Sequence, residues 1–392
     1  MATVHSRAAV AARARLVGIV SSTAERSAVA AAELGFERPY RSLDELLADD
    51  GVQVVHVTTP NSLHAEQTLA VLAAGKHVVC EKPLATGTAD AERMAGAVGG
   101  LTASVPFVYR YHPIVREARA RVRSGELGVV LTLQGSYLQD WLLTADDDNW
   151  RVDARAGGRS RAFADIGSHL VDLLEFVSGD RVTRLAAVKR TFFADRAQHH
   201  VVTTEDAVAV TVGTRGGAIG TLLVSQAAPG RKNRLYIEIA GTQESVAFDQ
   251  EAPETLWVGR RVGSLIVPRD AAQLHPDAAR LVTVPPGHPQ GYQDAFNSFV
   301  EDTYAAIEGA EPEGLPRFED GLRAVRVTDA VMDSAERGAW VEIAPVEAAA
   351  VQARPVETAV VEAEVLEAAE VEAAVVEIWA PEASEQSGEL EP

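Results

Sequence analysis

The first hundred residues alternate short apolar runs with stretches of helical composition, and this alternation restricts the fold more than any other feature. Helices are expected at residues 23–34, 62–74 and 88–96, and strands at 15–21, 52–59, 77–80 and 103–108. Strands and helices that alternate at this length form βαβ units around a parallel sheet. The sequence therefore predicts an α/β domain over residues 1–108.

After residue 109 the chain changes to strands with little helix between them. Turn residues such as Arg215-Gly216-Gly217 and Gly241-Thr242 separate several of these strands, which is typical of hairpins. The expected strands lie at residues 129–137, 181–193, 207–214, 217–226, 233–240, 245–248 and 340–343, with helices at 114–124, 290–308 and 318–337. The pattern predicts an α+β domain with a mainly antiparallel sheet over residues 109–345.

The last segment, residues 346–392, is rich in alanine, valine and glutamate. It holds twelve glutamates and one arginine, a net charge of −11 out of −20 for the whole chain. Such composition predicts a disordered, solvated tail, with an interaction helix as the alternative. The remaining charge of −9 argues against a nucleic-acid binder, which would present a basic face.

Two further features bear on the compartment. No apolar run approaches the roughly 20 residues that a membrane span needs. The single cysteine, Cys80, excludes an internal disulfide and favours a reducing compartment, so we expect a cytoplasmic protein.

The strand at residues 77–80 ends in a charged pair and a proline, Glu81-Lys82-Pro83. In open parallel sheets, ligands bind outside the carboxyl ends of the strands, where Glu81 and Lys82 would project. Pro83 restricts Lys82 to extended geometry and would hold its ammonium in one direction. The alternative interpretation of these three residues is an ordinary polar turn.

A second candidate site is the segment from Asp165 to Asp172. If it is helical, His169 lies one turn from Asp165 and close to a turn from Asp172, so the imidazole has two possible carboxylate partners. A histidine held by a carboxylate is the usual construction of a general base near neutral pH. The alternative is a buried structural histidine.

Together these motifs resemble the Gfo/Idh/MocA oxidoreductase family. The resemblance spans about residues 1–343 and rests on Thr59-Pro60-Asn61 with His64, Gly75-Lys76-His77-Val78, Glu81-Lys82-Pro83-Leu84-Ala85 and Asp165-Ile166-Gly167-Ser168-His169. It implies a Rossmann domain joined to an α+β domain with an open-faced, mainly antiparallel sheet. It also implies hydride transfer between NAD(P) and a hydroxyl carbon of a sugar, cyclitol or related polyol, in a homodimer or homotetramer.

By motif, Lys82, Asp165 and His169 correspond to the family's catalytic residues. His169 would take the hydroxyl proton, Asp165 would orient it, and Lys82 would hydrogen-bond the reacting oxygen. The matching cofactor contacts are Thr58, Thr59, Pro60, Asn61, His64, Glu81 and Lys82.

Substrate contacts are expected from aromatic faces and bidentate donors, which suit a polyhydroxylated ring. The candidates are Arg110, Tyr111, Trp150, Arg151 and Tyr292, together with Asp165 and His169; the aromatic ones are equally consistent with core positions. No metal is expected, because His199-His200 has no acid or cysteine at ligand spacing.

The chain departs from the family at its beginning. Matching residues 4–6 and 16–18 to the family pattern places Ala2 at the third glycine of the G-x-G-x-x-G loop, so the first strand and two glycines would precede Met1. We therefore expect about a dozen residues to be missing, through a misplaced start or a shortened protein, and expect the chain as written to bind dinucleotide poorly.

Cofactor choice is expected at the end of the strand at residues 15–21. An acid there normally binds the ribose 2′-hydroxyl, but this chain has Ser21 and Ser22 with Arg26 nearby, which favours NADP over NAD. The alternative to an enzyme is a family relative that binds a small ligand or a partner without turnover.

Overall fold

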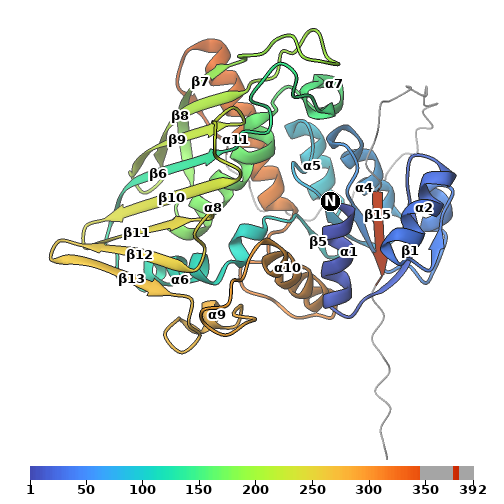
Figure 1. Ribbon diagram of the computed structural model, residues 1–392, viewed down its shortest axis with the longest axis horizontal. Helices are drawn as coiled ribbons and strands as arrows, with labels where there is room; N and C mark the ends of the chain where they lie inside the picture. Colours follow the sequence, from blue (N-terminus) through green and yellow to red (C-terminus); the bar gives the residue numbers. More distant parts are fainter. Residues whose placement is uncertain (345–373, 379–392) are drawn as a thin grey trace, which may run out of the picture.

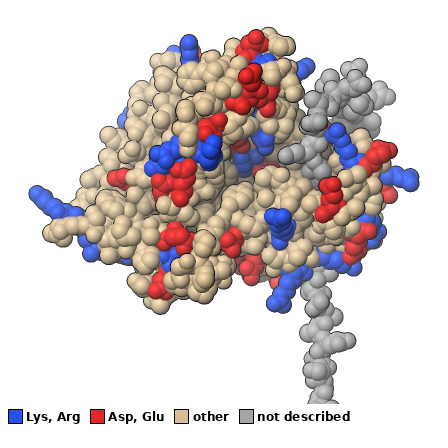
Figure 2. Space-filling view, viewed as in Figure 1, with Lys and Arg blue, Asp and Glu red and all other residues tan. Residues whose placement is uncertain are grey.

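The computed structural model describes residues 1–344 and 374–378. Figure 1 shows two halves side by side, with the N-terminal α/β elements on one side and a large sheet on the other. Acidic and basic side chains are interspersed over the face drawn in Figure 2. Many of them form ion pairs, such as Arg159 with Asp333 at 2.7 Å.

The N-terminal half confirms the predicted α/β alternation. Its strands form two short sheets, ordered β15-β1-β2 and β3-β4-β5, and the pairs within β1-β2 and β3-β4-β5 are parallel. The elements are α1 (Ala2–Ala11), β1 (Arg15–Val20), α2 (Ala24–Leu34), β2 (Arg38–Pro39), α3 (Leu43–Leu47), β3 (Val54–Val57), the 3₁₀ turn η1 (Asn61–Leu63), α4 (His64–Ala73), β4 (His77–Cys80), α5 (Thr88–Gly96) and β5 (Ala103–Ser104).

Strands β3 and β4 position the motif of Glu81 and Lys82. All four residues of β3 are buried, as are the last three of β4, which explains their continuous apolar sequence. Val57 pairs with Cys80, so both strands end at the same edge of the sheet. The Glu81 N–H donates to Val57 O at 2.9 Å, and the Lys82–Pro83 peptide that follows is cis.

The place between β1 and β3 is occupied by a strand from the end of the chain. This strand, β15 (Ala374–Ile378), pairs antiparallel with β1, and Ala374 lies opposite Val20. It also contacts β3, and Figure 1 shows it between β1 and the remaining N-terminal strands. For these five residues the structure differs from the predicted disordered tail; the rest of that segment lies outside the described residues.

The C-terminal half is built on a nine-stranded sheet of order β13-β12-β11-β10-β6-β9-β8-β7-β14. All neighbours are antiparallel except β6 and β9, which confirms the mainly antiparallel prediction. The strands are β6 (Val130–Leu138), β7 (Val182–Arg190), β8 (Ala207–Thr214), β9 (Ile219–Ser225), β10 (Arg234–Gly241), β11 (Glu244–Asp249), β12 (Thr255–Arg260), β13 (Gly263–Pro268) and β14 (Val341–Glu342).

Three helices, α6 (Pro113–Arg123), α8 (Ser168–Ser178) and α11 (Phe318–Arg337), pack on one face of this sheet and leave the other open. The other helical elements of this half are the 3₁₀ turns η2 (Val108–Tyr111) and η3 (Trp150–Val152), the π turn η4 (Phe163–Gly167), and the helices α7 (Ala154–Gly157), α9 (Pro276–Ala279) and α10 (Tyr292–Ile307). Every residue of α8 is buried. Close packing onto the sheet is possible because a Cβ at Gly135 of β6 would lie 2.8 Å from Leu170 of α8.

The two halves are joined by the last long helices. Helix α10 packs against α1, and α11 packs against both α5 and β7, so the C-terminal helices return to the N-terminal half. The division of the chain after residue 108 therefore stays a prediction. Among the described residues, no helix combines the length and the apolar character that crossing a membrane requires.

Candidate active site

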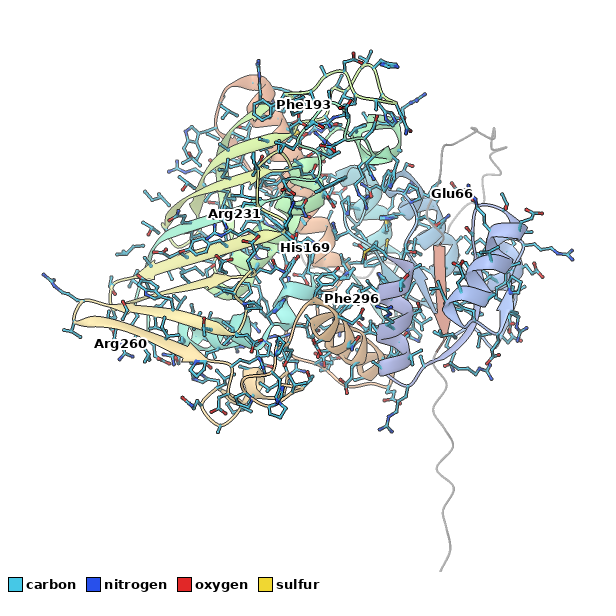
Figure 3. All side chains as sticks on the ribbon, in the orientation of Figure 1. Glu66, His169, Phe193, Arg231, Arg260 and Phe296 are labelled. Carbon is cyan, nitrogen blue, oxygen red and sulfur yellow. The ribbon has the colours of Figure 1, made fainter. Side chains whose placement is uncertain are left out.

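A cleft of about 440 Å³ lies where the two halves meet. It brings together the end of β4, the loop after β3, the turn η4 and the sheet strands β6 and β10, and Figure 3 places His169 in this region. Its lining residues are Met1, Thr58, Thr59, Pro60, Asn61, His64, Glu81, Lys82, Tyr109, Tyr137, Gln139, Trp141, Trp150, Arg151, Asp165, Ile166, His169, Asn233 and Tyr292. The cleft thus contains all three residues predicted to be catalytic.

Lys82 and Asp165 form an ion pair across the cleft. The Lys82 ammonium donates to Asp165 Oδ1 at 2.6 Å and to the Asp165 backbone carbonyl at 2.9 Å. The second carboxylate oxygen accepts from Gln226 Nε2 at 2.9 Å. Burial would raise the pKa of Asp165, but Lys82 and Arg151 outweigh it and hold that pKa at about 2, so the carboxylate is ionised at neutral pH.

The turn that carries Asp165 is fixed by a buried carboxylate. Glu205 accepts from Ser160 Oγ at 2.8 Å and from the Phe163 N–H at 2.9 Å, which anchors the start of η4. At its end, a Cβ on Gly167 would come within 2.6 Å of the Phe163 ring, so only glycine allows the turn to close this tightly. The π turn therefore sets the direction in which Asp165 faces the cleft.

His169 is buried beside this pair but is not bonded to Asp165. Its ring stacks edge-on against Tyr109, with centroids 5.0 Å apart. Its Nδ1 has no hydrogen-bond partner within residues 1–344. Burial, reinforced by Lys82, lowers the pKa of His169 to about 3, so the imidazole is neutral and can accept a proton.

The two carboxylate partners expected for His169 are thus engaged elsewhere. Asp165 holds Lys82, and Asp172 accepts from Arg110, whose Nε lies 2.8 Å from Asp172 Oδ2. Arg110 also pairs with Asp320 at 3.0 Å. The expectation that Asp165 or Asp172 orients the imidazole is wrong for this structure, because stronger cations lie closer to both carboxylates.

The low pKa of His169 predicts an acid-sensitive fold. The ordinary pKa of histidine is 6.5, so below that pH His169 binds a proton in the unfolded chain but stays neutral in the folded chain. The free energy of unfolding therefore falls as the pH drops from 6.5 toward 3. His169→Gln should remove this contribution, which is about 2 kcal/mol between pH 7 and pH 5. Denaturant unfolding at both pH values measures it, with the exposed His200→Gln as control. An unchanged pH dependence in His169→Gln would contradict the assignment.

The loop after β3 holds several of the residues expected to contact the cofactor. Thr58 to Asn61 line the cleft beside Glu81 and Lys82. His64 also lines it, but both of its ring nitrogens lie 2.8 Å from backbone carbonyls, those of Thr59 and Pro83. His64 therefore joins the loop after β3 to the loop after β4.

The beginning of α1 completes this side of the cleft. The helix begins at Ala2, and Met1 lines the cleft. Backbone N–H groups at a helix N-terminus favour phosphate groups. The residues present thus fit a dinucleotide, which the loop after β3, Lys82 and the beginning of α1 would hold.

Ser21, Ser22 and Arg26 lie after β1 and do not line this cleft. Arg26 Nη1 donates to Ser22 Oγ at 3.2 Å on the surface, and the Ser21 N–H donates to Ser27 Oγ at 2.8 Å. Their position at the carboxyl end of β1 is the one expected for contacts to the adenosine ribose.

The predicted substrate residues divide into two groups. Trp150, Arg151 and Tyr292 line the cleft, and the Arg151 guanidinium lies 4.5 Å from the Trp150 ring centroid. Arg110 and Tyr111 do not line it; both are buried, Arg110 in its ion pairs and Tyr111 against Phe299. Their expected contact with substrate is corrected to a structural role, since Arg110 joins η2 to α8 and α11.

The sheet side of the cleft also holds Gln139, Asn233, Tyr109 and Tyr137, which were not predicted from the sequence. Trp141 Nε1 donates to Gln139 at 2.7 Å, Gln139 donates to Asn233 at 2.8 Å, and the Tyr109 and Tyr137 hydroxyls lie 2.5 Å apart. Tyr137, Gln139 and Asn233, with Gln226, lie at or just beyond strand ends, which is the one signal that would have singled them out. No group of three metal-binding side chains occurs in the part of the chain that the structure describes.

Comparison with known protein families resolves the identity of this arrangement. Residues 1–101 match the oxidoreductase family with an NAD-binding Rossmann fold, and residues 115–247 match the GFO/IDH/MocA C-terminal domain. The chain belongs to the Gfo/Idh/MocA oxidoreductase family. This confirms the family, the fold class and the oxidoreductase assignment predicted from the motifs.

Several members of this family are similar over most of their length. The oxidoreductase domain protein from Kribbella flavida has 36% identity and a TM-score of 0.81, covering 88% of this chain and 96% of that one. Levoglucosan dehydrogenase in complex with NADH and levoglucosan has 30% identity and a TM-score of 0.81, covering 87% and 96%. D-xylose 1-dehydrogenase (NADP(+)) 2 of Haloferax volcanii is 28% identical, covering 83% and 91%.

Proposed function

We propose that this Gfo/Idh/MocA protein transfers a hydride between NAD(P) and a hydroxyl carbon of a sugar, cyclitol or related polyol. The observation that carries the proposal is the Lys82–Asp165 pair beside the neutral His169 in one cleft. Relatives named for levoglucosan and D-xylose support a polyhydroxylated substrate. The aromatic and amide side chains of the cleft suit such a ring.

The protein's part in the reaction follows from these groups. The nicotinamide supplies the hydride chemistry, and the chain supplies orientation and proton transfer. Lys82 donates a hydrogen bond to the reacting oxygen and stabilises the negative charge that develops there. His169 takes the hydroxyl proton, for which it must be neutral beforehand. Asp165 holds the Lys82 side chain in one direction, since its carboxylate accepts from Lys82 Nζ at 2.6 Å.

For the cofactor we propose NAD or NADP, with a preference for NADP. Arg26 and the two serines after β1 offer a cation and hydroxyls where a 2′-phosphate would lie, and the position directly after β1 holds Ser21 in place of a carboxylate. The relatives are divided, since one is named with NADH and another with NADP(+). The single cysteine is buried as a free thiol, which suits the cytoplasm as the proposed compartment.

The test is calorimetric titration of NAD and NADP, followed by a panel of sugars and cyclitols monitored at the absorbance of the reduced nicotinamide. It uses the full chain and a form with the family's glycine-rich loop added before Met1. We expect nucleotide binding in at least the second form, turnover with one class of polyol, and weaker NADP binding in Arg26→Ala. Binding by neither form would favour the alternative, a relative that binds ligand without turnover.

We also propose a homodimer or homotetramer formed through the open face of the large sheet. That face carries solvent-exposed apolar side chains, including Ile219 and Leu223 of β9. Exposed apolar patches commonly mark interfaces between subunits.

The open face predicts the effect of one substitution on assembly. Leu223→Asp places a charge there without disturbing the core, since the side chain is 45% exposed. We expect light scattering after size exclusion to show a smaller particle than wild type, whereas Val29→Asp on α2, at 57% exposure, should leave the mass unchanged. A monomeric wild type, or an unchanged mass for Leu223→Asp, would contradict the proposed interface.

A further inference from the structure

Behind the cleft lies a buried chain of hydrogen bonds that the proposed reaction does not use. It runs from Tyr304 on α10 through His56 on β3 and His5 on α1 to Glu81 at the end of β4. The Tyr304 hydroxyl lies 3.0 Å from His56 Nε2, the two Nδ1 atoms of His56 and His5 are 2.8 Å apart, and His5 Nε2 lies 3.0 Å from Glu81 Oε1. All four side chains are buried.

The protonation pattern of this chain follows from its end on Glu81. Burial would raise the pKa of Glu81, but His5 and Lys82 outweigh it and hold that pKa at about 2, so the carboxylate only accepts. His5 Nε2 must then carry a proton. Burial and the neighbouring His5 lower the pKa of His56, which is therefore neutral. A neutral His56 carries one ring proton, on Nδ1 facing His5 or on Nε2 facing Tyr304, and accepts at the other nitrogen.

The row of hydrogen bonds ends at Glu81, which contacts the backbone of Lys82. Glu81 Oε2 accepts the backbone N–H of Lys82 at 3.0 Å. The same carboxylate therefore contacts His5 through one oxygen and the backbone N–H of Lys82 through the other. Lys82 is the residue whose side chain would contact the substrate. A buried carboxylate needs both donors to stay ionised and fixed.

We propose that Tyr304, His56 and His5 act as positioning residues, which hold the Glu81 carboxylate ionised and in one orientation and thereby fix Lys82 against Asp165. This inference rests on the proposed function. The contacts run in the order Tyr304, His56, His5, Glu81, and they place a ring proton on His5 Nε2 whichever nitrogen of His56 is protonated.

The first test needs no turnover. Nitrogen-15 NMR of the histidine rings in the full-length protein reports which nitrogen carries the proton. We expect a proton on His5 Nε2 and a single ring proton on His56, assigned by the loss of each signal in His5→Gln and His56→Gln. An unprotonated His5 Nε2, or a charged His56 at pH 7, would overturn the proposal even if the protein proves to be an active dehydrogenase.

The second test separates positioning from a structural role. His5→Leu removes the donor to Glu81, whereas the matched His5→Gln keeps an N–H at a similar reach. We expect His5→Leu to lower kcat/KM about 10- to 100-fold, mainly through kcat, and His5→Gln to stay within about threefold of wild type. The pH profile of His5→Leu should gain an acid limb as Glu81 becomes protonated.

The groups around Glu81 that must be considered in that profile are the Met1 amino group, His5, Lys82, His64, His169 and Tyr292. A double variant distinguishes them, because the His5→Leu effect should vanish in a Glu81→Gln background if His5 acts through Glu81. Additive losses, or equal losses in His5→Leu and His5→Gln, would overturn the proposal. Tyr304→Phe, which removes only a hydroxyl, should give a smaller loss in the same direction.

Discussion

Lys82→Met is expected to lower kcat/KM by about 10²- to 10⁴-fold while leaving the fold intact. The methionine keeps the length of the side chain but removes the ammonium that donates to Asp165 and would donate to the reacting oxygen. The loss should appear in kcat more than in KM, because the hydrogen bond strengthens as charge develops on that oxygen. Steady-state kinetics with the substrate found in the polyol panel measures it.

Lys189→Met is the matched control for this substitution. Lys189 is also partly buried and also faces a carboxylate, Glu336 at 3.3 Å, but it lies on β7 and not in the cleft. It should keep wild-type turnover. A Lys82→Met variant that turns over as fast as this control would remove Lys82 from the proposed mechanism.

The second large effect is expected from Asp206→Asn, which should lower the free energy of unfolding by about 3 to 5 kcal/mol. Asp206 is fully buried directly before β8 and pairs with both Arg161 and Arg196. It also accepts the Phe193 backbone N–H at 3.1 Å. Its neutralisation leaves two buried guanidinium groups without their counter-charge, which costs far more than the loss of one hydrogen bond.

Denaturant unfolding at pH 7 measures this loss, and Asp195→Asn serves as its control. Asp195 pairs with His200 at 2.8 Å, but its side chain is 79% exposed, so the same chemical change should have an effect within about 0.5 kcal/mol. A similar stability for both variants would show that the Arg161 and Arg196 charges are compensated elsewhere. The Asp206 variant should also lose turnover, since Arg161 lies two residues before the turn that carries Asp165.

The sequence correctly predicted the features of the fold that depend on the local pattern of residues. Alternating strands and helices predicted the α/β half, and a charged pair at the end of a buried strand predicted the place of Lys82. The hairpin of β12 and β13 was missed, because the two residues of its turn, Arg261 and Val262, include no glycine, asparagine or aspartate.

The contacts that depend on pairing between distant segments could not be predicted. Arg110 was expected in the site but pairs with Asp172, 62 residues away, and His5 meets His56 across 51 residues. Residue type alone does not determine which carboxylate a buried arginine reaches. Likewise, Gln226 and Asn233 became site residues only through the register of β9 and β10.

The antiparallel direction of β15 places the beginning of this strand beside the end of β1. Because Ala374 lies opposite Val20, the chain enters this strand at the edge of the sheet where β1 ends, the edge from which a dinucleotide is expected to approach. The dinucleotide would therefore approach the same edge of the sheet at which the polypeptide enters β15. By thermodynamic reciprocity, any change in dinucleotide affinity caused by β15 is matched by an equal change in the pairing strength of β15 when the dinucleotide binds.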